Sequence, residues 1–179
     1  TGATTGSLTL TDGTTGCVGV SPVFTIKVIC SATLTIKAYL QGYYDASSSS
    51  MRPVWTNHLR TDLGNGNMGT PVGTEADLVM VELYDASNTL AYSDSMMLDI
   101  DGNGSVSFPS AVNGNSYYIM IKHRCHIQTR SAGLVLMGAS TSYDFTTAST
   151  QVDEIGSASY GGPMMVEVEP GVWAFFAGD

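Results

Sequence analysis

Basic residues, charged residues as a whole and long apolar runs are all scarce in this sequence. Seven lysines and arginines stand against sixteen acidic residues, which gives a formal net charge of -9 over 179 residues. That charge repels a phosphate backbone, so we expect no nucleic-acid partner. Charged residues make up only 13% of the chain, with 43% hydrophobic, which argues against disorder and coiled coils. No apolar run reaches the ~18 residues of a membrane-spanning helix, so no membrane span is expected.

Motifs of common catalytic sites are missing as well. The sequence has no Gly-x-Ser-x-Gly, no His-Glu-x-x-His and no phosphate-binding loop, which are the patterns that place nucleophiles, zinc ligands and phosphates. We therefore expect no enzyme and no catalytic residues. The chain begins at Thr1, without Met or a signal-like segment, which predicts a mature secreted product or a piece of a longer protein.

Short segments that alternate apolar and polar residues dominate what is present. Leu34, Ile36, Ala38 and Leu40 are one such set, with the period of two that is typical of half-buried strands. Glycine, asparagine, aspartate and serine separate the segments, which predicts an all-β fold, an antiparallel β-sandwich of the Ig-like or jelly-roll-like kind. The expected strands are 8–10, 23–30, 34–40, 78–84, 89–98, 105–108, 117–123, 134–137, 143–145, 165–169 and 172–176, with a long surface loop over 45–74.

Residues 1–30 are expected to form an extended strand arm, and residues 31–179 the sandwich. Within the arm, Phe24, Ile26 and Val28 lie on one face of a strand and Ile29 on the other. A strand that is apolar on both faces is typical of burial between two layers, and strand edges rarely stay unpaired. If this strand pairs with a second copy, the contact is head to tail and does not close, so it propagates. The arm therefore predicts a homo-oligomeric filament.

Several landmarks follow one another in an order that is known from a protein family. They are Leu-Thr-Ile-Lys-Ala-Tyr-Leu-Gln-Gly-Tyr-Tyr (34–44), Met51-Arg52, residues 77–83, Ser-Tyr-Tyr-Ile-Met-Ile-Lys-His-Arg (116–124), Tyr-Asp-Phe (143–145) and Pro-Gly-Val-Trp (170–173). In this order they resemble a β-sandwich module of secreted and cell-surface proteins of the Bacteroidota that are exported by the type IX system. Residues 11–17 and 21–23 resemble the closing strands of the Ig-like repeats that often precede it.

The resemblance implies an extracellular or cell-surface location and a modular architecture. Together with the arm it predicts a structural subunit or module of an extracellular filament or surface adhesin. The alternative is a carbohydrate-binding accessory domain of a secreted enzyme. In that case Tyr43, Tyr44 and Trp55, which lie around the long loop, would stack on the faces of surface glycans.

One segment has the letters of a calcium loop. Asp99, Asp101 and Asn103 occupy its first, third and fifth positions and Gly104 the sixth, where carboxylate and amide oxygens would surround a hard cation. The twelfth position is Ser110 in place of the usual glutamate. The alternative is a hairpin turn, which favours the same residue types without a metal.

Three of the seven basic residues, Lys122, Arg124 and Arg130, lie within nine positions. They predict a subunit contact that receives an acidic neighbour. The alternative is a set of ion pairs inside the domain, with Asp144 or Glu167 as partners.

Three cysteines allow one disulfide and leave one thiol over. A tight hairpin near 19–22 would separate Cys17 from Cys30 by ~20 Å, at ~3.3 Å per residue, which is too far for a bridge. We therefore expect a Cys30–Cys125 bond, with Cys17 free or paired with another subunit; the alternative is that all three stay reduced. Cys125 also lies near His123 and His126, but strand alternation turns His126 away unless the chain bends, so a structural or interface role is preferred to a transition-metal site.

Overall fold

The computed structural model describes residues 10–11, 18–19, 31–54, 73–153 and 164–178. The chain divides into two compact units, residues 1–30 and residues 31–179. In the first unit, β1 (Leu10–Thr11) pairs antiparallel with β2 (Val18–Gly19). The expected strand over 23–30 lies outside the described residues, and so do its contact residues Phe24, Ile26, Val28 and Ile29.

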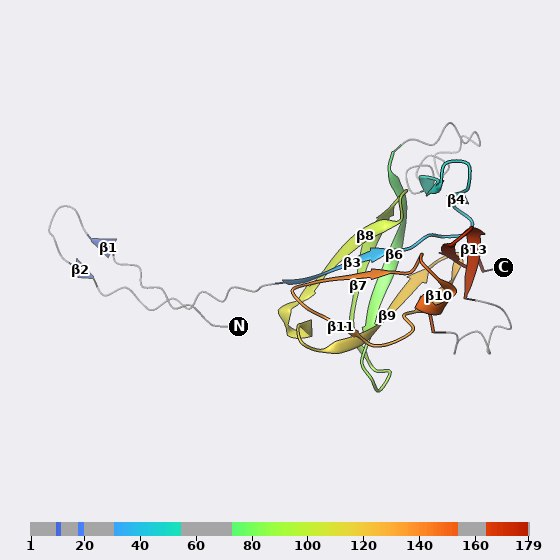
Figure 1. Cartoon of the computed structure of the whole chain (residues 1–179). Helices are drawn as coiled ribbons and strands as arrows, with labels where there is room; N and C mark the ends of the chain where they lie inside the picture. The colour runs from blue at the N-terminus through green and yellow to red at the C-terminus, as the bar shows by residue number, and fades with distance from the viewer. Residues whose placement is uncertain (1–9, 12–17, 20–30, 55–72, 154–163, 179) are drawn as a thin grey trace. The chain divides into compact units, whose positions relative to one another are not determined.

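The second unit is built of β-strands (Figure 1), which confirms the predicted all-β class. Two short 3-10 helices, η1 (Ser110–Val112) and η2 (Ser149–Gln151), lie between strands. The strands are β3 (Ser31–Lys37), β4 (Tyr44–Asp45), β5 (Ser50–Met51), β6 (Glu75–Tyr84), β7 (Leu90–Asp99), β8 (Asn103–Pro109), β9 (Ser116–His123), β10 (His126–Arg130), β11 (Val135–Leu136), β12 (Ser140–Asp144), β13 (Met165–Glu169) and β14 (Val172–Phe175). The segment predicted as a loop from residue 45 thus begins with the small β4–β5 hairpin.

Two sheets form the sandwich. The larger has the order β10-β9-β6-β7, with β11 also paired to β9, and all of its pairs are antiparallel. The smaller has the order β12-β3-β8. Here β12 runs parallel to β3, with Ser140 opposite Thr33 and Asp144 opposite Lys37, which departs from the antiparallel prediction. Alternation of apolar residues reports which face of a strand is buried and carries no information on its direction.

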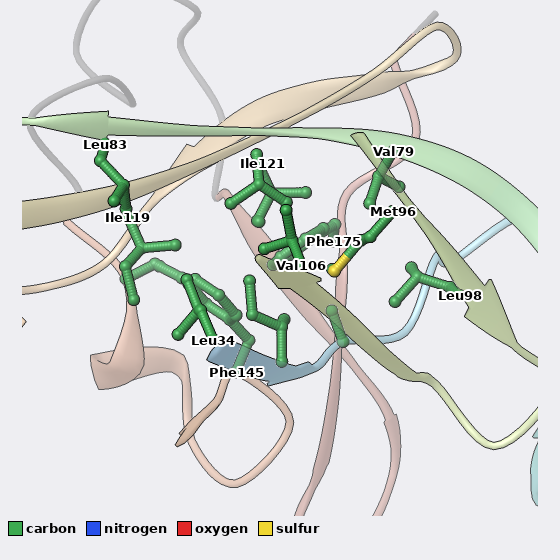
Figure 2. Close-up of a cluster of buried hydrophobic side chains, with 14 of the residues drawn as sticks. Leu34, Val79, Leu83, Met96, Leu98, Val106, Ile119, Ile121, Phe145 and Phe175 are labelled. Atoms are coloured by element: carbon green, nitrogen blue, oxygen red, sulfur yellow. The ribbon is translucent and has the colours of Figure 1, made fainter. Parts of the chain in front are cut away.

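The core lies between the sheets, as Figure 2 shows. Val79, Val81 and Leu83 are each at most 1% exposed, as predicted, and Figure 2 shows Val79 and Leu83 pointing inward from β6. Burial of aliphatic side chains of this size contributes about 1.5–3 kcal/mol each before ordering costs. Phe145 and Phe175 close the core edge to face, with ring centroids 5.1 Å apart.

The outer faces of the two sheets differ in chemistry. On the smaller sheet the register aligns a row of hydroxyls, Ser140, Thr33 and Ser107, across all three strands. On the larger sheet the central strand β6 presents Leu78 and Met80, which are 41% and 45% exposed. The sandwich therefore has one hydroxyl-rich side and one partly apolar side.

Candidate functional site

The apolar core gives way to polar side chains at one end of β6 and β9. On β6, the inward series that holds Val79 and Val81 continues to Asp77, which is fully buried. On β9, the inward series that holds Ile119 and Ile121 continues to His123, whose side chain is 1% exposed. These two residues meet Tyr43, Arg124 and His126, and we call the five side chains the Asp77 cluster.

The Asp77 carboxylate is the centre of this cluster. Its Oδ2 accepts hydrogen bonds from the Tyr43 hydroxyl at 2.8 Å, from His123 Nε2 at 3.1 Å and from the Arg124 guanidinium at 2.6 Å. Its Oδ1 accepts the backbone N–H of Leu78 at 2.8 Å. Three donors therefore converge on Oδ2 and one reaches Oδ1. This arrangement holds the side chains of Tyr43, His123 and Arg124 in place around Asp77.

Hydrogen bonding assigns the proton positions on both histidines. His123 Nδ1 accepts the backbone N–H of Cys125 at 3.2 Å, so this nitrogen carries no proton, and Nε2 carries the proton that is donated to Asp77. His123 Nδ1 also lies 2.8 Å from His126 Nδ1. His126 Nδ1 must then be the donor of that bond. Its Nε2 is then a buried lone pair, and no described residue donates a hydrogen bond to it.

Burial sets the protonation of the cluster. It lowers the pKa of His126 to about 4, with a smaller contribution from the neighbouring His123. Burial also lowers the pKa of His123, although Asp77 opposes that effect. Burial, followed by the hydrogen bond to Asp77, raises the pKa of Tyr43 to about 12. At neutral pH the cluster therefore contains two neutral imidazoles and a neutral phenol, with the charges of Asp77 and Arg124 paired.

A tight hairpin brings the two histidines together. β9 ends at His123 and β10 begins at His126, so Arg124 and Cys125 form the turn and the two histidines are paired across it. The strand argument required a bend for His126 to approach His123, and the reversal of the chain between them is that bend. The rings lie 4.8 Å apart, and Tyr43 packs edge to face on each of them at 5.6 Å.

No protein family, curated protein or solved structure matches this chain. The resemblance to the Bacteroidota module stays a prediction. Within the described ranges, no helix is long and apolar enough to cross a membrane. Over the same ranges, no three His, Cys, Asp or Glu side chains are grouped so that they could hold a metal ion.

Each cation of the predicted subunit contact has an acidic partner inside the domain. Lys122 pairs with Glu82 at 2.7 Å, and Arg124 pairs with Asp77. Arg130 pairs with Asp153, and its guanidinium also lies over the ring of Tyr118. The alternative partners Asp144 and Glu167 are thus replaced by Glu82, Asp77 and Asp153, which sequence spacing does not indicate. A role of these cations in a subunit contact stays a prediction.

The segment 99–104 forms a tight turn. Asp99 Oδ1 accepts the backbone N–H of Asn103 at 2.7 Å, and Asp99 Oδ2 lies 3.4 Å from the Asn103 amide. Gly102 has a φ of +80°, and a Cβ there would lie 2.6 Å from the carbonyl oxygen of Ala38. Both carboxylate oxygens of Asp99 therefore face N–H groups of Asn103, and calcium binding by Asp99, Asp101 and Asn103 stays a prediction.

The predicted glycan residues are only partly described. The Tyr43 hydroxyl is bound within the Asp77 cluster, and the Tyr44 ring packs edge to face on Tyr39 at 4.8 Å. Trp55 lies outside the described residues. The two described tyrosines thus have partners inside the domain.

Cys125 is exposed in the β9–β10 turn and has no disulfide partner among the described residues, whereas the disulfide prediction placed it on a strand. Cys30 and Cys17 lie outside the described residues, so the Cys30–Cys125 bond stays a prediction.

Sequence reasoning did not single out Asp77 or the pairing of the histidines. The sequence does contain a signal for Asp77. Val79 and Val81 face inward, and the same spacing of two residues places Asp77 on the inward face of the strand. The same spacing from Ile119 and Ile121 places His123 inward. A buried charge needs partners, so these two positions together indicate a polar cluster at one end of the core.

Proposed function

We propose that this chain is a structural module of an extracellular assembly, a filament or surface adhesin, in which residues 1–30 of one copy add a strand to the sandwich of the next. The observation that carries the proposal is a pair of strand edges. Among the described strands, β7 pairs only with β6, and β8 pairs only with β3. Unpaired N–H and C=O groups along such edges are a template for an incoming strand.

The β7 edge has features that select its partner. Asp94 lies opposite Val81, on the core side of the sheet, yet it is exposed, and its Oδ1 accepts the N–H of Ser95 at 2.8 Å. A charge that points inward on an edge strand blocks indiscriminate pairing. A partner strand with a basic residue at the matching position would satisfy it. Lys27 is the one basic residue of the arm sequence 1–30, so the arm meets this requirement.

The Asp77 cluster supports a structural role over a catalytic one. Its only carboxylate is occupied by four donors of the protein itself. Three of these donors converge on one oxygen, Oδ2, and hold the Asp77 side chain in a fixed position. The cluster thus ties the turn after Leu40 to β6 and to the β9–β10 hairpin, as a rigid module requires.

The test uses the full-length chain, with mass measured by light scattering and particle shape by electron microscopy. Ile26→Asp places a charge on the apolar face of the arm and should leave monomers. Ile26→Val is the matched control, because it changes the same position but keeps that face of the arm apolar. Wild-type protein that stays monomeric at every concentration would refute the assembly.

A charge exchange tests the β7 edge itself. Asp94→Lys and Lys27→Glu should each shorten or abolish filaments, because like charges then face each other, and the double variant should restore them. Filaments that are unaffected by either single substitution would place the contact on another edge.

Carbohydrate binding remains the alternative function. It predicts affinity for a polysaccharide that is lost on Tyr44→Ala or Trp55→Ala. We also retain calcium as a proposed ligand of the 99–104 turn. Millimolar calcium should then raise the melting temperature of the wild type and leave Asp101→Asn unchanged, whereas identical melting curves with calcium and with chelator would remove the metal.

A further inference from the structure

The His126 imidazole combines burial with an unsatisfied lone pair. The residue is 8% exposed, and its Nε2 has no hydrogen-bond partner among the described residues. Leaving a buried acceptor unpaired costs about 1–3 kcal/mol, so such a group calls for an explanation. The chain segment that runs beside His126 suggests a role for this unpaired nitrogen.

That segment is the end of the described chain, residues 176–178. The backbone N–H of Gly178 donates to the carbonyl of Cys125 at 3.0 Å, and the N–H of Ile127 donates to the carbonyl of Phe176 at 3.1 Å. Between these two bonds, His126 and Ala177 form an antiparallel bridge. The segment 176–178 is therefore attached to the hairpin on both sides of His126.

We propose that His126 is an acid-sensitive latch: the bonds between residues 176–178 and the β9–β10 hairpin hold at neutral pH and open when His126 Nε2 takes up a proton. Phe176 and Ala177 keep their own bonds, from their N–H groups to the carbonyl of Met164 and to Oε1 of Gln41. The latch goes beyond the proposed function, and it holds whether or not the chain polymerises.

Protonation of His126 destabilises the closed arrangement, and opening relieves this cost. The proton enters at Nε2, because Nδ1 already carries the proton that is donated to His123. The new N–H is buried without an acceptor, and the imidazolium is a buried charge. To bring Nε2 to water, residues 125–127 must move, and these are the residues whose backbone binds 176–178.

The described groups around His126 stabilise an imidazolium only weakly. Asp77 attracts a charge on His126, but it is already paired with Arg124, and burial outweighs its effect on the pKa of His126. The segment 176–178 consists of Phe, Ala and Gly and contributes no ionisable side chain. The ionisable groups around His126 are Asp77 from β6, His123 from β9, Arg124 and Cys125 from the turn, and Tyr43 from the turn after Leu40.

Opening is confined to the end of the segment. Strand β14 has anchors of its own, because the N–H of Phe175 donates to Tyr39 at 2.8 Å and that of Trp173 donates to Thr146 at 2.9 Å. The side chain of Phe175 is also buried in the core. The amides of Phe175 and Gly178 thus report on two different events in one molecule.

The experiment measures hydrogen-exchange protection factors by NMR on the full chain from pH 7 to pH 4.5. Release linked to one proton should lower the protection of the Gly178 amide by about tenfold for each pH unit below about 6.5. The Phe175 amide should change by less than about twofold, because its anchors do not involve the latch. A flat Gly178 profile would overturn the proposal, and so would parallel loss at Phe175, since that is unfolding of the whole domain.

Two variants assign the proton to His126. His126→Asn retains an N–H that can donate to His123 Nδ1 but cannot be protonated, so its Gly178 protection should not depend on pH. His58→Asn removes the only histidine outside the pair and should keep the wild-type dependence. The same pH dependence in His126→Asn would overturn the proposal. If that variant does not fold, the midpoint of the His126 ring titration in the wild type must coincide with that of the Gly178 amide shift, and different midpoints would overturn it.

Discussion

The middle and the end of β6 and β9 bury their inward side chains in opposite ways. In the middle, Val81 and Ile121 lie opposite each other in the pair of strands, and each is at most 1% exposed. At the end, Asp77 follows Val79 and His123 follows Ile121 in the inward series, and the two side chains are as deeply buried. The two regions have the same alternation of side chains and the same degree of burial. They differ only in whether the buried side chains are apolar or polar.

The difference teaches what each region needs in order to be stable. Apolar burial is non-directional, so the middle depends on volume and shape. A buried polar group costs free energy unless it is bonded, so the end depends on every donor and acceptor being matched. The two regions should therefore tolerate different kinds of substitution.

The largest effect is expected in the apolar region. Phe145→Ala removes a fully buried ring that packs on Phe175, and it should lower the free energy of unfolding by about 3–5 kcal/mol. Phe145→Leu should cost clearly less, because it keeps more of the volume. Urea denaturation measures both, and equal losses would mean that the site does not depend on volume.

The next effect is expected at the polar end. Asp77→Asn keeps the shape but replaces one acceptor oxygen by a donor that faces other donors, and it should cost about 2–3 kcal/mol. Asp94→Asn makes the same chemical change at an exposed position and should stay within about 0.5 kcal/mol. If Asp77→Asn is as mild as Asp94→Asn in denaturant titrations, the four bonds to Asp77 do not contribute to stability.

The apolar region could be predicted from the sequence to a larger extent than the polar region. Alternation alone places Val79, Val81 and Leu83 in the core, because burial of aliphatic side chains leaves a periodic signal. It does not place Asp77 beside Tyr43, since those residues are 34 positions apart and their contact depends on where the turn after Leu40 returns. The convergence of His123 and His126 depends on the reversal at Arg124 and Cys125, which carry no turn signature of glycine or asparagine.

Strand direction and sheet edges also lie beyond the sequence pattern. The parallel pairing of β12 with β3, and the edge of β7 that pairs with no described strand, follow from the path of the chain between the sheets. The alternation of residues along β12 and β3, which starts at the pair Ser140 and Thr33, would look the same if the two strands ran antiparallel. Only long-range packing decides between the two.

A third effect depends on pH. The pKa of His126 in the folded protein is about 4, below the ordinary value of 6.5, so the unfolded chain binds the proton more tightly. The stability that the neutral ring contributes is complete above pH 6.5 and is lost as the pH falls towards 4, at about 1.4 kcal/mol per unit. Denaturant titrations of wild type and His126→Asn between pH 7 and 5 measure this loss of stability. The free energies of unfolding of the two proteins, plotted against pH, should diverge below pH 6.5. Parallel curves would contradict this role of His126.

The smallest effect is expected on the outside of the same strand. Met80 lies between Val79 and Val81 but is 45% exposed. Met80→Ser should change the free energy of unfolding by no more than about 0.5 kcal/mol, whereas Val81→Ser leaves a cavity and a buried hydroxyl and should cost several times more. Comparable losses in denaturant titrations would mean that the outer face is covered.

The measurement that tests the Asp77 cluster most directly is nitrogen NMR of the two imidazole rings in the wild-type protein at pH 7. The hydrogen bonds predict a neutral His123 with its proton on Nε2 and a neutral His126 with its proton on Nδ1. Ring nitrogen shifts distinguish the two tautomers from each other and from the imidazolium. A His126 proton on Nε2, or a charged ring at either position at pH 7, would contradict the account.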